Sequence, residues 1–216
     1  MKHKILSITN GDAYNTYFRT TFSREAFPFR EVMMDGDAVE EIGSEAFMRA
    51  RARTHGVSYE KYVKRAAVLT VLKNNLDEYD EVHLYFGKDV FCQMNLLTLL
   101  AFLEQLGCQS RVTLFYIDDE TFRTLEGMIR VTLDGYSALY KAILVEKKKC
   151  AAVGVILPRA IDLYFDYLSE NGELAGIVKK HKEETELSLV SILLNASREY
   201  GLSDLQAKAL IEKYKK

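Results

Sequence analysis

The chain has 216 residues, of which 48% are hydrophobic, which is enough for one sizeable core or for a core domain with a smaller appendage. Its 29 basic and 31 acidic residues give a formal charge of -2, which excludes a strong general attraction to nucleic acid or to an anionic membrane. The three cysteines contain no C-x-x-C pair, so the sequence predicts neither a disulfide framework nor a zinc knuckle.

The N-terminal segment MKHKILSITNGD has too short an apolar run for a signal peptide. No stretch reaches the roughly 18 uninterrupted apolar residues of a membrane span. Together with the free cysteines, these features predict a soluble cytoplasmic protein that has no membrane partner.

Short apolar segments alternate with helical patterns along the first part of the chain. This alternation favours an open, mostly parallel, Rossmann-like sheet of about four to five strands with helices on both faces. We therefore expect an α/β domain over residues 1–118. Its predicted strands are 3–9, 27–33, 80–87 and 110–118, and its predicted helices are 45–56, 58–76 and 90–103.

From Asp119 the pattern becomes mainly helical. Residues 128–133 resemble a strand, and Asp134 is the expected cap of a helix behind them. Pro158 suits the first turn of another helix, and two or three helices follow, with a break at EYGLSD. We expect residues 119–216 to form a mostly helical C-terminal region packed on the α/β domain.

Polar side chains gather where three predicted strands end. Ligands of open parallel sheets bind at the carboxyl ends of the strands, because loops and helix N-termini converge there. Asp89 and Gln93 are spaced i, i+4 at the start of a very apolar helix, so both can face the same crevice. The predicted ligand-binding residues are Asn10, Gly11, Asp12, Arg30, Glu31, Asp89 and Gln93.

These residue types suit a small polar or phosphorylated ligand, with a nucleotide as one candidate. Arg30 can contact anionic oxygens as a planar fork, and the carboxylates of Asp12, Glu31 and Asp89 can accept hydroxyl or amine donors or hold a divalent metal. Asp89 or Glu31 is the candidate acid or base if a reaction is catalysed. Neither a reaction nor a cofactor is identified by these residues.

A closed structural network is the competing interpretation. Asp12 and Asp89 suit helix capping. A buried Gln93 amide without a partner would cost roughly 1 to 3 kcal/mol. The chain has no G-x-x-x-x-G-K-[ST], G-x-G-x-x-G or G-x-S-x-G motif, and its four histidines lack metal-site spacing, so no metal site is predicted.

Four segments together resemble the bacterial family called domain of unknown function 1835: ITNGDA, FREVMMDG, VHLYFGKDVFCQMNLL and YGLSDLQAKALIE. The resemblance covers most of the chain and implies an N-terminal α/β domain whose signature positions match the seven residues named above. The chain departs from the pattern at Phe29 and Tyr85, where the family often has tryptophan, and at Cys92, where an acidic residue is frequent. The resemblance implies no particular reaction.

Two other functions are alternatives. The helices around EYGLSD could belong to a helix-turn-helix, which would make the protein a regulatory or nucleic-acid-binding module. The C-terminal helices could instead join two copies in a homodimeric scaffold.

Overall fold

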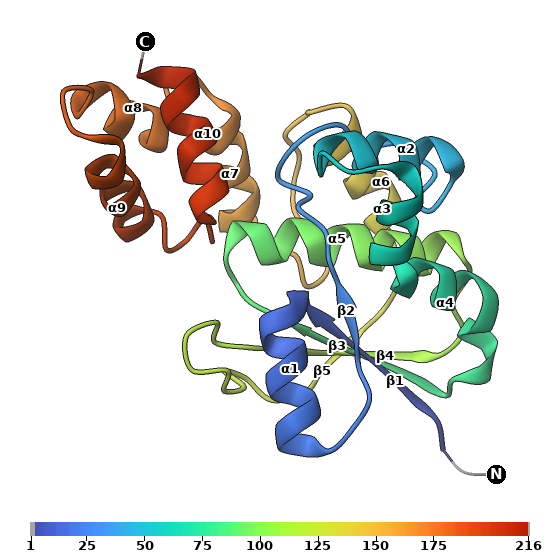
Figure 1. The fold of residues 1–216 in the computed structure, drawn as a ribbon. Coiled ribbons are helices and arrows are strands. Elements are labelled where there is room, and N and C mark those ends of the chain that lie inside the picture. The colour runs from blue at the N-terminus through green and yellow to red at the C-terminus, as the bar shows by residue number, and fades with distance from the viewer. Residues whose placement is uncertain (1–2, 216) are drawn as a thin grey trace.

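The computed structural model describes residues 3–215. These residues contain a five-stranded sheet (Figure 1). In chain order the strands are β1 (Ile5–Asn10), β2 (Phe27–Phe29), β3 (Glu81–Phe86), β4 (Arg111–Tyr116) and β5 (Ile129–Val131). Their order in space is β2-β1-β3-β4-β5, with β5 antiparallel to β4 and all other pairs parallel. The predicted α/β class is therefore confirmed.

Helices connect the strands and form the C-terminal part. They are α1 (Gly11–Phe22), α2 (Glu45–Thr54), α3 (Tyr59–Arg65), α4 (Ala67–Asn75), the 3-10 turn η1 (Leu76–Glu78), α5 (Val90–Gln105), α6 (Tyr136–Tyr140), the π turn η2 (Lys141–Val145), α7 (Pro158–Leu168), α8 (Glu173–Lys180), α9 (Glu186–Ala196) and α10 (Asp204–Tyr214). Within residues 3–215, no helix has the length and apolarity needed to cross a membrane.

The two faces of the sheet are covered by different helices. Alternating residues of β3 show the division, because successive side chains of a strand point to opposite faces. Val82 and Leu84 belong to the main core together with α5. Tyr85 lies on the other face, where its ring is 4.8 Å from that of Phe18 in α1.

Helix α5 lies inside the molecule between the sheet and α6 and α7. Every residue from Val90 to Leu103 except Phe91 is buried. A helix enclosed on all sides needs an apolar surface all round, which explains why its sequence has almost no polar face. Asp89 caps it as predicted, with Oδ1 accepting a hydrogen bond from the backbone N–H of Cys92 at 2.8 Å.

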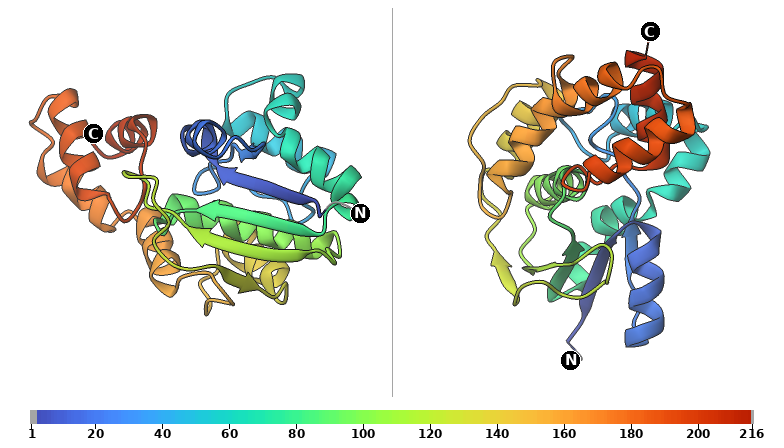
Figure 2. Two further views of the ribbon diagram at one scale, coloured as in Figure 1. Left: turned by 90° about the horizontal axis from the view of Figure 1, so that it is seen from below. Right: turned by 90° about the vertical axis from the view of Figure 1, so that its left-hand side faces the viewer.

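Helices α7 to α10 lie beyond the carboxyl ends of the strands (Figure 2). One polar contact that joins them to the α/β part is the Asp35 carboxylate, in the loop after β2. It accepts hydrogen bonds from the Tyr167 hydroxyl at 2.6 Å and from Gln206 Nε2 at 2.8 Å. The C-terminal helices are thus held at the edge of the sheet where a ligand crevice is expected.

The structure differs from the predicted elements at three places. The helix predicted over 58–76 is divided at Ala66, whose ψ of 25° leaves the helical range. Strand β2 ends at Phe29, so residues 30–33 are not part of the sheet. Strand β5 confirms the strand-like pattern of residues 128–133, but it also shows that the sheet continues beyond residue 118 into the region predicted to be mostly helical; the division of the chain at that residue stays a prediction.

Asp134 was also the wrong residue for the cap of α6. The N-cap is Gly135, in the left-handed conformation with φ 82°, and it has no side chain to accept a bond. The carboxylate of Glu104, at the end of α5, accepts from the backbone N–H groups of Gly135 and Ser137 instead. The cap comes from a residue about thirty positions earlier, which local sequence does not reveal.

Candidate functional site

The strand order reverses between β1 and β3, and a ligand crevice is expected at such a switch point. Three polar residues follow or end neighbouring parallel strands there. Asn10 is the last residue of β1, Asp89 follows β3, and Asp119 follows β4. They line a hollow of about 410 Å³, which we call the switch-point crevice; Cys92, Arg198 and Gly201 also line it.

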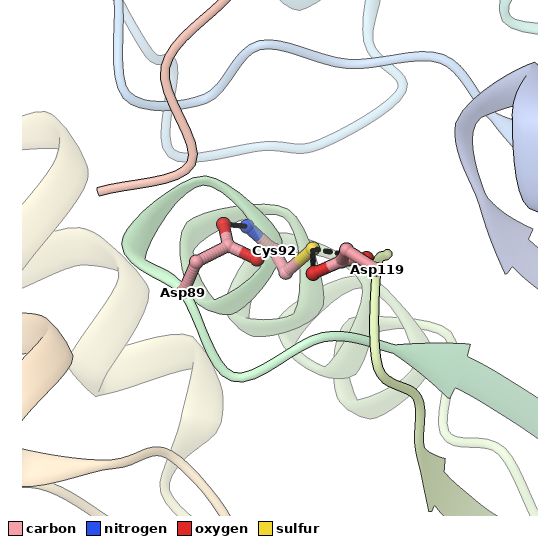
Figure 3. Close-up of side chains that lie close together, drawn as sticks. All are labelled: Asp89, Cys92 and Asp119. Atoms are coloured by element: carbon pink, nitrogen blue, oxygen red, sulfur yellow. Dashed lines mark hydrogen bonds between the residues drawn. The ribbon is translucent and has the colours of Figure 1, made fainter. Parts of the chain in front are cut away.

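Asp89, Cys92 and Asp119 form the centre of this site, with the two carboxyl groups on either side of the thiol (Figure 3). One carboxylate oxygen of each aspartate and the Sγ of Cys92 all lie within 4.8 Å of one another. Cys92 Sγ is 3.8 and 3.9 Å from the Asp119 oxygens and accepts a hydrogen bond from Asn10 Nδ2 at 2.8 Å. The three groups are therefore close enough to contact one small ligand or one metal ion.

The electrostatics of the site favour neutral forms of two of these groups. The removal of the Asp119 carboxyl from water, together with the nearby Asp89 carboxylate, raises the pKa of Asp119 to about 8. Burial, and then the charges of Asp89 and Asp119, raise the pKa of the Cys92 thiol well above its ordinary value. Cys92 is therefore an unreactive thiol, and Asp119 keeps its proton at neutral pH.

Two glycines allow the carboxyl groups to lie against the backbone. A Cβ atom at Gly87 would lie 2.2 Å from Asp119 Oδ2, and a Cβ atom at Gly201 would lie 2.2 Å from Asp89 Oδ1. Asp119 is exposed as a residue, but this contact with Gly87 explains why its carboxyl is partly withdrawn from water. Residues from both halves of the chain thus shape the pair.

The N-terminus of α5 is closed by the segment between α9 and α10. The N–H groups of Val90 and Phe91 donate to the carbonyls of Glu199 and Tyr200 at 2.9 and 3.1 Å. Asp89 accepts the next N–H group, from Cys92. These groups would otherwise be available to an anion, so the protein's own carbonyls occupy the anion-binding end of this helix.

The N-terminus of α1 is differently arranged. Its N-cap residue Asn10 makes no side-chain capping bond, because its amide contacts Cys92 and its carbonyl oxygen accepts from Asn95 Nδ2 at 2.9 Å. Gly11 has φ 75°, and no atom lies within 4 Å of the place where its Cβ would be. The first turn of α1 therefore offers backbone N–H groups next to the switch-point crevice, without a side-chain cap.

Glu31 lies in a closed buried network and does not face this crevice. Its Oε2 accepts from Arg51 Nε at 2.9 Å and lies 3.3 Å from His55 Nε2, and Tyr62 donates its hydroxyl proton to Oε1. Arg51 is fully buried and also donates to the carbonyls of Val32 and Asp35. Burial would raise the pKa of Glu31, but the hydrogen bond with His55 and the charge of Arg51 outweigh it and lower the pKa.

Gln93 is also held by structural partners. It is fully buried, its Nε2 donates to the Gly87 carbonyl at 3.0 Å, and its Oε1 accepts from the Leu157 N–H at 3.0 Å. The side chain therefore joins the loop after β3 to the start of α7. It shapes the neighbourhood of the site without presenting a free polar group.

Arg30 and Asp12 form an ion pair at the edge of the sheet. Arg30 Nε lies 2.8 and 3.0 Å from the two Asp12 oxygens, and the two side chains are 32% and 65% exposed. Among residues 3–215, neither Arg30 nor Asp12 belongs to the lining of the switch-point crevice. The structure thus brings Asn10 and Asp89 together at the crevice, with Gly11 adjacent to Asn10, and places the other four predicted residues in separate contacts.

Asp119, Arg198 and Gly201 were not predicted as site residues. Asp119 follows a parallel strand, so the strand-end rule that selected Asp89 would also have selected it. Arg198 and Gly201 come from the C-terminal helices and reach the site through tertiary contacts, for which the local sequence carries no signal. The group formed by Asp89, Cys92 and Asp119 also depends on tertiary contacts, so no metal-binding spacing in the sequence could predict it.

Comparisons of the chain with protein-family models, with curated proteins and with solved structures found no match. The resemblance to domain of unknown function 1835 therefore stays a prediction. Function has to be inferred from the geometry of the site.

Asp119→Asn is expected to stabilise the protein at high pH. The unfolded carboxyl ionises near pH 3.8, whereas the folded one keeps its proton to about pH 8, so the folded state binds more protons across this window and the free energy of unfolding falls as pH rises. Because water screens this exposed residue, we expect a gain on the order of 1 kcal/mol at pH 8 and none below pH 3.8. Denaturant unfolding at both pH values measures the difference, and a variant less stable than wild type at pH 8 would contradict the proximity of the two carboxyl groups.

Glu31→Gln should strongly destabilise the fold. The change leaves the buried Arg51 charge without its counter-ion, which typically costs about 3 to 5 kcal/mol. Since the folded pKa of Glu31 is lowered, wild type has this stabilisation above about pH 4.5 and loses it as pH falls further. Urea unfolding at pH 7 provides the test, with Asp12→Asn as a control that breaks an exposed pair and should cost less than about 1 kcal/mol. Equal losses of unfolding free energy in Glu31→Gln and Asp12→Asn would show that the buried pair is no more important for stability than the exposed one.

Gly201→Ala should disturb Asp89 as well as the backbone. Its φ of 67° is unfavourable for alanine, and its Cβ would collide with the Asp89 carboxylate. Gly107→Ala is a matched control, because Gly107 has φ 65° and open space at the Cβ position. We expect both variants to lose about 1 to 2 kcal/mol from backbone strain, with a further loss only at Gly201. Equal losses of unfolding free energy would show that Gly201 is not packed against Asp89.

Proposed function

We propose that the protein binds a small polar ligand in the switch-point crevice, through hydroxyl or amine donors that contact Asp89 and Asp119. The observation that carries this proposal is a pair of carboxyl groups from the ends of the neighbouring strands β3 and β4, beside the point where the strand order reverses between β1 and β3. The crevice volume of about 410 Å³ is in the usual range for small-molecule sites.

Capping of α5 explains Asp89, but it does not explain why a second carboxyl group, that of Asp119, lies beside it. Carboxylates that stabilise a fold are usually paired with cations, as Glu31 is with Arg51. Within residues 3–215, no lysine, arginine or histidine nitrogen lies within 4.0 Å of an Asp89 or Asp119 oxygen. Two unneutralised carboxyl groups, one with a raised pKa, are typical of a functional site.

A phosphate or other anionic group on the ligand would find one suitable helix N-terminus. The first turn of α1 has no side-chain cap and lies beside Asn10, whereas the first turn of α5 is closed by Glu199 and Tyr200. This difference favours an arrangement in which the anionic end of the ligand lies near Gly11 and its donor groups lie near the aspartates.

The alternative functions receive less support. The carbonyls of the segment between α9 and α10 accept hydrogen bonds from the first N–H groups of α5, and α10 buries Ala207, Leu210 and Ile211. These contacts fit packing against the rest of the chain better than insertion into a DNA groove. A homodimer through the C-terminal helices stays an alternative.

Asp89→Asn and Asp119→Asn provide the test. Asparagine keeps the helix cap at position 89, so the fold is retained while the acceptor charge is lost. A panel of small polar and phosphorylated metabolites is screened by thermal shift, and each ligand found is measured by calorimetry. At pH 9, above the pKa of Asp119, we expect each variant to weaken binding at least about tenfold, the usual cost of a hydrogen bond to a charged group.

Asp77→Asn is the control, because Asp77 is exposed in η1 before β3, at the opposite edge of the sheet. It should bind the ligand like wild type. A ligand that binds wild type, Asp89→Asn and Asp119→Asn with equal affinity would place the site elsewhere.

A further inference from the structure

A second hollow adjoins the aspartate pair on the side away from Asn10. It has a volume of about 390 Å³ and lies between the loop after β3, the loop after β4 and the start of α7. Aliphatic side chains form much of its wall: Ile117, Leu125, Leu157, Ala160 and Leu163. We call it the aliphatic hollow. For comparison, an engineered apolar cavity of about 150 Å³ is large enough for benzene, so an aromatic ring system has room here.

The basic residues around the aliphatic hollow are already paired. Lys88 forms an ion pair with Glu126, and Arg159 donates to both oxygens of Glu199 at 3.2 and 3.0 Å. Arg198 lies 3.8 Å from Glu120. A ligand group in this hollow therefore meets aliphatic surface, paired basic residues and the carboxyl groups of three aspartates, Asp89, Asp118 and Asp119. This combination favours a flat group that carries hydrogen-bond donors over an anionic group.

The two hollows share three of their lining residues. Asp89, Asp119 and Arg198 line both the aliphatic hollow and the switch-point crevice. A ligand that contacts the carboxyl pair at its middle can thus extend in two directions. One direction leads to the aliphatic wall, and the other leads past Asn10 to the open first turn of α1.

We propose that the ligand is a nucleoside 5′-phosphate, with its base in the aliphatic hollow, its ribose hydroxyls on Asp89 and Asp119, and its phosphate at the first turn of α1. This inference rests on the proposed function of the crevice. The order of the three environments matches the order of base, ribose and phosphate in such a molecule. Carboxylates are suited to accept both hydroxyl protons of a ribose, and a helix N-terminus is suited to a phosphate.

Leu125 offers a variant that tests the base position without endangering the fold. It lines the aliphatic hollow from a loop and is 49% exposed, so Leu125→Glu places a charge in the hollow but buries nothing new. Leu187 is 81% exposed on α9 and lines neither hollow, so Leu187→Glu is the matched control.

Calorimetric titrations of the full chain compare the 5′-monophosphates of adenosine, guanosine, cytidine and uridine with ribose 5-phosphate and inorganic phosphate. We expect at least one nucleotide to bind about 10- to 100-fold tighter than ribose 5-phosphate, which is the usual gain from burying one apolar group of side-chain size. Leu125→Glu should reduce that nucleotide's affinity to the level of ribose 5-phosphate, and Leu187→Glu should leave it unchanged.

Nucleotides that bind no tighter than ribose 5-phosphate, or that bind Leu125→Glu as well as wild type, would overturn the inference. So would a different ligand, such as an apolar amine, that binds wild type and is lost in Asp89→Asn and Asp119→Asn while no nucleotide binds. That last result would leave the proposed function of the crevice intact. A nucleotide could also lose affinity in Leu125→Glu as predicted and yet bind Asp89→Asn and Asp119→Asn as tightly as wild type. That result would overturn the placement of the ribose and the proposed function together.

Discussion

The first turn of α5 is the contact on which the rest of the structure depends. Its backbone N–H groups bind Glu199, Tyr200 and the Asp89 side chain, so a helix that is buried along most of its length is also satisfied at its start. The same bonds bring the segment before α10 to the end of β3. The switch-point crevice consequently has one wall from the sheet and one from the C-terminal helices, and it exists only while these two parts are held together.

The polar residues near this contact are of two physical kinds. Glu31 and Gln93 are buried and have a partner for each polar atom, so they stabilise the fold and define the positions of the loops around them. Asp89 and Asp119 lie at the surface of a crevice, close to each other and without a cation. Such an arrangement costs stability in the free protein, and a ligand that supplies donors or positive charge would recover that cost.

The alternation of apolar segments and helical patterns was enough to predict the parallel sheet, because buried parallel strands and the helices that cross over them have distinct periods. The strand-end rule correctly led to Asp89 and Asn10. It could not separate them from Glu31 and Gln93, because the partners of these two residues are Arg51 and Leu157, 20 and 64 positions away. Asp119 was not selected as a site residue because the chain after β4 was assigned to another region, although β5 continues the sheet.

The central claim is that the carboxyl groups of Asp89 and Asp119 meet at one site, and the titration of Asp119 measures this most directly. Carbon-13 NMR of the labelled side-chain carboxyl, followed from pH 3 to pH 10, reports its pKa in the folded protein. Partial removal from water, together with the nearby Asp89 carboxylate, predicts a midpoint of about 8, and a bound cationic or donor ligand should lower it. A midpoint near the ordinary value of 3.8 would show that the two carboxyl groups do not share a site.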